Sequence, residues 1–192
     1  MARNVEFNEE EAIRKAMEVF WKKGYSGASL RDLTDAMQIN SSSLYNTIGD
    51  KHELFVRCIK NYTETKMDEA LKRAESASSP LAAIINLIND SVTVIINEDK
   101  SCMAIKTTFE IAVGDKSVQA ILKADSDFTH NFVLSLITKA RAMGELKDDE
   151  DPEMLTDYFI SMIAGWHQSY ILHRDPVRLK KMGQYLINQL SG

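Results

Sequence analysis

The sequence predicts an all-α protein of about nine helices. Only 8 glycines and 3 prolines occur among its 192 residues, too few for a turn-rich sheet protein. Residues with high helix propensity recur in long uninterrupted runs, and apolar residues within those runs recur every three or four positions, the spacing of one helix face. At 44% hydrophobic residues, the chain can bury a core as one domain or as a small module followed by a larger one.

The first helix is expected from Asn8 to about Lys23. The Asn8 side chain can cap the helix, and Glu11 three positions later is the reciprocal partner of a capping box. Apolar residues then follow at three- and four-residue spacing. Gly24 supplies a left-handed stop.

A second and a third short helix follow. Ser29 with Asp32 three positions later repeats the start signal, and a short apolar stripe runs to about residue 37. A tight turn leads to residues 41–47, about two helical turns whose three serines suit the exposed N-terminal end of a helix. Gly49 ends this segment. Three short helices with a tight turn before the third match a helix-turn-helix unit.

The longer helices lie in the remaining chain. Pro80 fits a first helical position, where its missing N–H donor would be unpaired anyway. Gly114, Gly144 and Pro176 mark breaks between helices. The expected helices span residues 51 to about 74, 80–97, 103–113, 116–143, 152–173 and 176–190.

Charge and cysteine content limit the function classes. The net charge is −5, and residues 1–57 carry 8 basic against 9 acidic side chains. This near balance counts against general polyanion binding, so any contact with nucleic acid must be local.

Cys58 and Cys102 lie far apart and indicate neither a disulfide framework nor a zinc site. The acidic N-terminus lacks a signal-peptide core, and no apolar run approaches about 18 residues, so the protein is expected in the cytoplasm.

Three stretches carry a family resemblance. They are residues 24–33 (GYSGASLRDL), 39–45 (INSSSLY) and 50–54 (DKHEL). Together they resemble the N-terminal domain of the tetracycline-repressor (TetR) family over residues 8–57, whereas the rest of the chain resembles it in helix pattern only. Gln38 departs from the glycine usual in the family's turn, and residues 47–48 replace a typical aromatic pair.

The resemblance implies that the third helix enters the major groove of DNA and that Tyr45 and Lys51 contact phosphates. A tyrosine hydroxyl can donate to a phosphate oxygen, and a lysine beside a helix start adds positive charge. Ser29 is expected to act likewise through its helix N-terminus. With few basic contacts the salt dependence is expected to be shallow, and Lys51→Ala to lower its slope by about 1. Hydroxyls and an amide suited to reading base edges occur at Ser41, Ser42, Ser43 and Asn46.

The C-terminal half is expected to pair two copies. One short recognition helix binds DNA too weakly and does not fix the position of the protein along the duplex. A homodimer that reads a palindromic operator is therefore expected, with its interface within about residues 152–190. Gly165 and Gly183 would permit close helix approach. The alternative is that the apolar seam only closes the monomer's core. The seam has near-heptad spacing and consists of Leu179, Met182, Leu186 and Leu190.

Residues between these parts are candidates for a sensor site. Adaptable and aromatic side chains can line an apolar pocket, although each can equally be plain core. Cys102 is a candidate redox sensor. Residues 101–110 (SCMAIKTTFE) resemble a segment that recurs in a subgroup of the family containing some electrophile-responsive repressors, and Lys100 and Lys106 could lower its thiol pKa. The alternative for Cys102 is a small buried hydrophobe, as expected for Cys58. The effector-binding candidates are Met103, Phe109, Glu110, Phe132, Met162, Trp166 and His167.

These observations predict a helix-turn-helix domain at residues 1–50 and a helical effector-binding and dimerisation domain at residues 51–192. The expected function is a repressor that binds operator DNA as a homodimer and is released by a small-molecule effector. Alternatives are the same regulator switched by thiol modification at Cys102, or a non-catalytic helical interaction protein. An enzyme is not expected, since no P-loop, GxGxxG, HExxH or GxSxG motif occurs and no two histidines have i,i+4 spacing. No cofactor or metal is expected.

Overall fold

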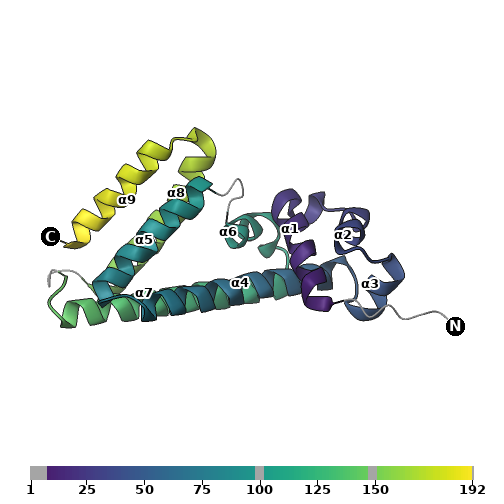
Figure 1. Cartoon of the computed structure of the whole chain (residues 1–192), viewed down its shortest axis with the longest axis horizontal. Coiled ribbons are helices and arrows are strands. Elements are labelled where there is room, and N and C mark those ends of the chain that lie inside the picture. Colours follow the sequence, from purple (N-terminus) through teal and green to yellow (C-terminus); the bar gives the residue numbers. More distant parts are fainter. Residues whose placement is uncertain (1–7, 98–101, 147–150, 192) are drawn as a thin grey trace. The chain divides into compact units, whose positions relative to one another are not determined.

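The computed structural model describes residues 8–97, 102–146 and 151–191. Within these ranges the chain forms nine α-helices and one π-helical turn, with no strand (Figure 1). The all-α prediction is therefore confirmed. The elements are α1 Glu9–Gly27, α2 Leu30–Met37, α3 Ser41–Thr47, α4 Lys51–Glu75, α5 Pro80–Asn97, α6 Met103–Thr107, the π-helical turn η1 Thr108–Ala112, α7 Lys116–Ala142, α8 Pro152–His173 and α9 Pro176–Ser191.

Contacts divide the chain into two compact units. The first unit comprises residues up to Glu64 together with Met103–Leu122, and the second unit comprises Thr65–Cys102 and the chain from Lys123 onward. The first unit therefore extends beyond the boundary predicted at residue 50 and includes α6 and η1. The assignment of functional domains to 1–50 and 51–192 stays a prediction.

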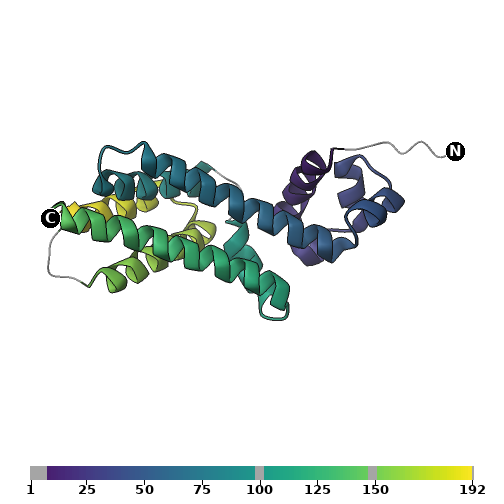
Figure 2. The same cartoon turned by 90° about the horizontal axis from the view of Figure 1, so that it is seen from below.

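In the first unit, α1, α2 and α3 group around the start of α4 (Figures 1 and 2). Phe20 of α1 and Phe55 of α4 meet edge to face, with ring centroids 4.9 Å apart, and both are buried. Leu33 of α2 and Leu44 of α3 are fully buried as well. Each of these four helices thus contributes a buried apolar side chain to the first unit.

The end of α1 differs from the prediction. Asn8 caps the helix as expected, its Oδ1 accepting from Glu11 N at 3.1 Å. Gly24 does have a positive φ of 76°, but the helix continues beyond it to Gly27. Gly24 is therefore a break inside α1 and not its stop.

In the second unit, α5 packs against both α8 and α9. Ile84 and Ile88 of α5, Trp166 of α8 and Leu186 of α9 are among its most buried side chains. α5 has 18 residues with a mean hydropathy of 1.4, which meets the length and hydropathy of a membrane span, although the sequence led us to expect no such run. Most of its apolar side chains belong to or pack against this core, as in the core helix of a helical bundle.

The interpretation of the α9 seam as a dimer interface is wrong. Leu179, Leu186 and Leu190 are buried in the core of the second unit, and Met182 packs against that core. A Cβ added at Gly183 would lie 2.8 Å from Val92 Cγ2 of α5, so the close approach at Gly183 is made within one chain. The spacing of apolar residues correctly identified the buried face of α9, but that face packs against α5 of the same chain and not against a second copy.

Candidate nucleic-acid interface

α3 is held to the first unit by one side. The Asn40 side chain caps it by accepting from Ser43 N at 2.8 Å. Leu44, at 0% exposure, anchors its middle, and Ile48 is buried directly after its end. The preceding turn uses Gln38 in the left-handed region at φ 59°. These anchors leave the opposite side of the helix to solvent.

The predicted DNA-contact residues of α3 lie on that solvent side. Ser41, Ser42 and Asn46 are exposed and Ser43 is half-buried, while Tyr45 is 50% exposed. Within the described residues, neither Tyr45 nor Asn46 has a hydrogen-bonding partner for its side chain. Their donors and acceptors are therefore available to an external partner.

Lys51 lies at the first position of α4. Its Nζ is 4.7 Å from the centroid of the Tyr25 ring, a cation–π distance. The start of α4 is fixed by a reciprocal cap, in which Glu53 N donates to Asp50 Oδ1 and Asp50 N donates to Glu53 Oε2, both at 2.9 Å. Tyr25 was not predicted as the neighbour of Lys51. Its position beside Gly24 gave no local signal of this contact.

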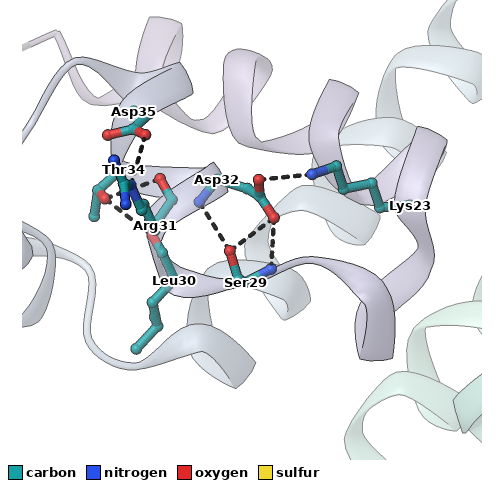
Figure 3. Close-up of polar contacts among 7 residues, drawn as sticks. All are labelled: Lys23, Ser29, Leu30, Arg31, Asp32, Thr34 and Asp35. Atoms are coloured by element: carbon teal, nitrogen blue, oxygen red, sulfur yellow. Dashed lines mark hydrogen bonds and ion pairs between the residues drawn. The ribbon is translucent and has the colours of Figure 1, made fainter.

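Ser29 caps α2 as predicted, but its hydroxyl is already engaged (Figure 3). Its Oγ accepts from Asp32 N at 3.1 Å and donates to Asp32 Oδ2 at 2.7 Å. Lys23 Nζ lies 2.6 Å from Asp32 Oδ1. Together the Lys23 ammonium and the Ser29 donors hold the pKa of Asp32 well below its usual range. A DNA contact from Ser29 would have to use its helix end and not a free hydroxyl, and it stays a prediction.

Comparison with known proteins identifies the family. The family model for bacterial regulatory proteins of the tetR family matches residues 12–58. The model for the tetracyclin repressor-like C-terminal domain matches residues 80–186. The chain belongs to the TetR family. As a member of this family it is a DNA-binding transcriptional regulator and not an enzyme.

Individual TetR relatives cover nearly the whole chain. The uncharacterized HTH-type transcriptional regulator YezE of Bacillus subtilis is 30% identical over 161 residues, covering 82% of this chain and 83% of the relative. The HTH-type transcriptional repressor ComR of Escherichia coli is 25% identical over 186 residues, covering 93% and 85%. A cysteine mutant of the TetR regulator CifR, solved with 26-base-pair operator DNA, is 23% identical with a TM-score of 0.85, covering 98% of this chain and 100% of that one.

The predicted effector-binding residues of this TetR protein fall into both compact units. Met103, Phe109 and Glu110 belong to the first unit and the other four to the second. Met103 is buried, whereas Phe109 is 85% exposed. The two Glu110 carboxylate oxygens accept from the backbone N–H groups of Tyr25 and Ser26. The effector role of these three residues stays a prediction.

The four candidates in the second unit have different surroundings. Trp166 is 1% exposed, and its Nε1 is the one buried side-chain polar atom without a partner among the described residues. Desolvation, with a smaller contribution from the nearby Lys66 ammonium, lowers the pKa of His167 to about 4. Phe132 and Met162 pack against the core as half-buried side chains. Their effector role also stays a prediction.

The two cysteines of this TetR protein differ in access. Cys58 is fully buried, its Sγ donates to Ile13 O at 3.5 Å, and burial raises the pKa of its thiol. Cys102 is half-buried and directly precedes α6. Its role as a redox sensor stays a prediction. Among the described residues no group of His, Cys, Asp or Glu is arranged to hold a metal ion.

Proposed function

We propose that this protein is a cytoplasmic repressor that binds a palindromic operator as a homodimer and releases it when a small-molecule effector binds. The observation that carries the proposal is the placement of α3. Leu44 of α3 is buried on one side of the helix, while Ser41, Ser42 and Asn46 on the other side are exposed to solvent. Two relatives, ComR of Escherichia coli and DhaR of Mycobacterium sp., are named as transcriptional repressors, which supports this direction of regulation.

α3 supplies the base contacts in this proposal, and its flanks supply phosphate contacts. Asn46 has an amide that can pair bidentately with adenine, and the serine hydroxyls can bond base edges. The Tyr45 hydroxyl and the Lys51 ammonium can each donate to a phosphate oxygen. Because residues 1–57 carry no basic excess, most of the specificity rests on α3 and on the use of two copies.

The dimer surface is the outward face of α8 and α9. These two helices contact one another, and both expose large apolar side chains. Apolar groups of this size on neighbouring helices favour burial against a second copy. Gly165, with nothing within 4 Å of an added Cβ, lies on α8 and leaves room for a close helix approach there. The exposed residues are Met154, Tyr158, Ile171, Leu172, Val177 and Tyr185.

Release by an effector requires that the effector bind one state of the protein better than the other. The unpartnered Nε1 of Trp166 supports an effector with a hydrogen-bond acceptor, because a buried donor without a partner is costly and gains most from one. The low pKa of His167 keeps the neighbouring imidazole uncharged at neutral pH. Both residues support the second unit as the effector-binding part.

A gel-shift experiment tests the proposal. The probe is duplex DNA flanking the protein's own gene, with a scrambled duplex for comparison. Tyr45→Phe removes only a hydroxyl and is expected to weaken binding to both duplexes, whereas Asn46→Ala is expected to weaken binding to the flanking DNA selectively. Asn61→Ala on α4, at an exposed position to which no role in binding is assigned, is the matched control and leaves binding unchanged. Equal binding by wild type, Tyr45→Phe and Asn46→Ala would contradict the proposal.

A further inference from the structure

The break in α1 removes two helical hydrogen bonds. In an unbroken helix, Tyr25 N would donate to Trp21 O and Ser26 N to Lys22 O. Gly24, with φ 76° and ψ 172°, turns the backbone out of the helical path between these donors and acceptors. Two N–H groups and two carbonyl groups therefore need other partners.

A single distant segment satisfies all four groups. Glu110 of η1 accepts from Tyr25 N through Oε2 and from Ser26 N through Oε1, both at 3.0 Å. Lys106 of α6 donates from Nζ to Trp21 O at 3.0 Å and to Lys22 O at 3.4 Å. The carboxylate lies at a helix N-terminus and the ammonium at a helix C-terminus, where each charge is favoured.

The φ of 76° favours glycine at residue 24, and the Glu110 carboxylate occupies the space where a side chain would begin. A Cβ added at Gly24 would lie 2.7 Å from both Glu110 oxygens, closer than real Cβ contacts allow. The break and the carboxylate therefore fit together as one arrangement within the first unit. We call the pair Lys106 and Glu110 the α1 splint.

The splint reaches the DNA-contact residues through Tyr25. Glu110 fixes the backbone of Tyr25, whose ring packs 5.0 Å from the Phe55 ring and 4.7 Å from Lys51 Nζ. The next residue of α4, His52, is bonded from Nε2 to Asp115 Oδ2 at 2.5 Å. Residues 106–115 thus contact both neighbours of Lys51. Glu110 binds the backbone of Tyr25, whose ring lies beside Lys51, and Asp115 binds His52, the next residue in the chain.

We infer that Glu110 and Lys106 are positioning residues for operator binding. They bridge the break in α1 by hydrogen bonds and, through the Tyr25 ring, hold the Lys51 ammonium where it meets a DNA phosphate. The inference rests on the proposed phosphate contact of Lys51. It assigns Glu110 to DNA affinity, in contrast to the effector contact expected from the sequence.

Simple electrostatics and the splint give opposite expectations for Glu110. Removing a negative charge from a DNA-binding unit ordinarily strengthens binding to the polyanion. Glu110→Gln instead replaces one accepting oxygen by an amide that points N–H groups at an N–H donor, which opens the splint. The splint therefore predicts weaker binding. Glu10→Gln in α1 is the matched control, since Glu10 is exposed and its neutralisation leaves affinity equal or slightly higher.

The test measures operator Kd between 50 and 200 mM salt for the full-length wild type, Lys51→Ala, Glu110→Gln and the double variant. Loss of one phosphate contact in each half-site lowers the slope of log Kd against log salt concentration by about 1.8. The factor by which operator affinity falls between 50 and 200 mM salt then becomes about twelvefold smaller. Lys51→Ala is expected to show this change and Glu110→Gln at least half of it. The double variant is expected to bind no worse than Lys51→Ala alone.

Glu110→Asp keeps the charge but withdraws the carboxylate by one methylene, and it is expected to weaken binding in the same direction. Faster exchange of the Tyr25 and Ser26 amide hydrogens in folded Glu110→Gln checks that the splint has opened. Unchanged or tighter operator binding by both Glu110 variants, or a loss additive to that of Lys51→Ala, would overturn the inference. If Lys51→Ala leaves the salt slope unchanged, the proposed phosphate contact fails first, and the inference fails with it.

Discussion

Gln38 offers a direct measure of backbone strain in the turn before α3. It has φ 59° and ψ 38°, a left-handed conformation that costs a residue with a Cβ about 1–2 kcal/mol. Replacement by glycine removes that cost, but it adds about 0.5–1 kcal/mol of conformational entropy to be lost on folding. The Gln38 side chain is exposed, so little burial is lost. At the midpoints of these two ranges, about 1.5 and about 0.75 kcal/mol, Gln38→Gly is therefore expected to raise the free energy of unfolding by about 0.5–1 kcal/mol.

Thermal and urea denaturation followed by circular dichroism measure this gain. For a chain of this size, about 0.5–1 kcal/mol corresponds to a rise in Tm of about 1–4 °C. Gly144→Ala is the matched control, because Gly144 has φ +70° with nothing within 4 Å of an added Cβ, so that only the backbone conformation changes. It is expected to lower stability by about 1 kcal/mol. A destabilised Gln38→Gly, or a neutral Gly144→Ala, would refute the reasoning.

Three further predictions concern charge, pairing and pH. Lys51→Ala is expected to lower the salt slope of operator binding by about 1 per subunit, and an unchanged slope measured by gel shift removes Lys51 from the interface. Tyr185→Asp is expected to give folded monomers in sedimentation, whereas Leu186→Ala lowers the free energy of unfolding by about 2–5 kcal/mol; a Tyr185→Asp dimer would argue against the proposed surface. Since the pKa of His167 falls from 6.5 to about 4 on folding, the unfolded chain binds the extra proton and stability falls as pH drops from about 6.5 to 4. His167→Gln is expected to flatten that decline in urea denaturation and the exposed His173→Gln to leave it unchanged; equal pH profiles for all three proteins would contradict this cause.

Helix starts could be predicted because their signals are local. Asn8 and Ser29 carry capping side chains, and Pro80 and Pro152 lie at first helical positions. Each signal acts within one turn of the helix it begins. The exposed face of α3 followed in the same way from residues 41–47 and the family resemblance.

Long-range contacts could not be predicted from the sequence. The spacing of Leu179 and Leu186 shows which face of α9 is apolar, but it does not say whether α5 or a second copy covers that face. Gly24 gave the signal of a helix stop, yet the helix resumes because Glu110, 85 residues after Tyr25, accepts from its N–H. Such partners depend on the assembled fold, and no local pattern encodes them.

The most direct test of α3 as the reading element is a base-by-base comparison of operator binding. The Kd of wild type and of Asn46→Ala would be measured for every single-base change in the operator found upstream of the gene. The wild type is expected to lose about 1–3 kcal/mol at the base that Asn46 contacts, at symmetric positions in both half-sites, while Asn46→Ala becomes indifferent at those positions. Identical base profiles for the wild type, Asn46→Ala and alanine variants of Ser41 and Ser42 would contradict the placement of α3 in the groove.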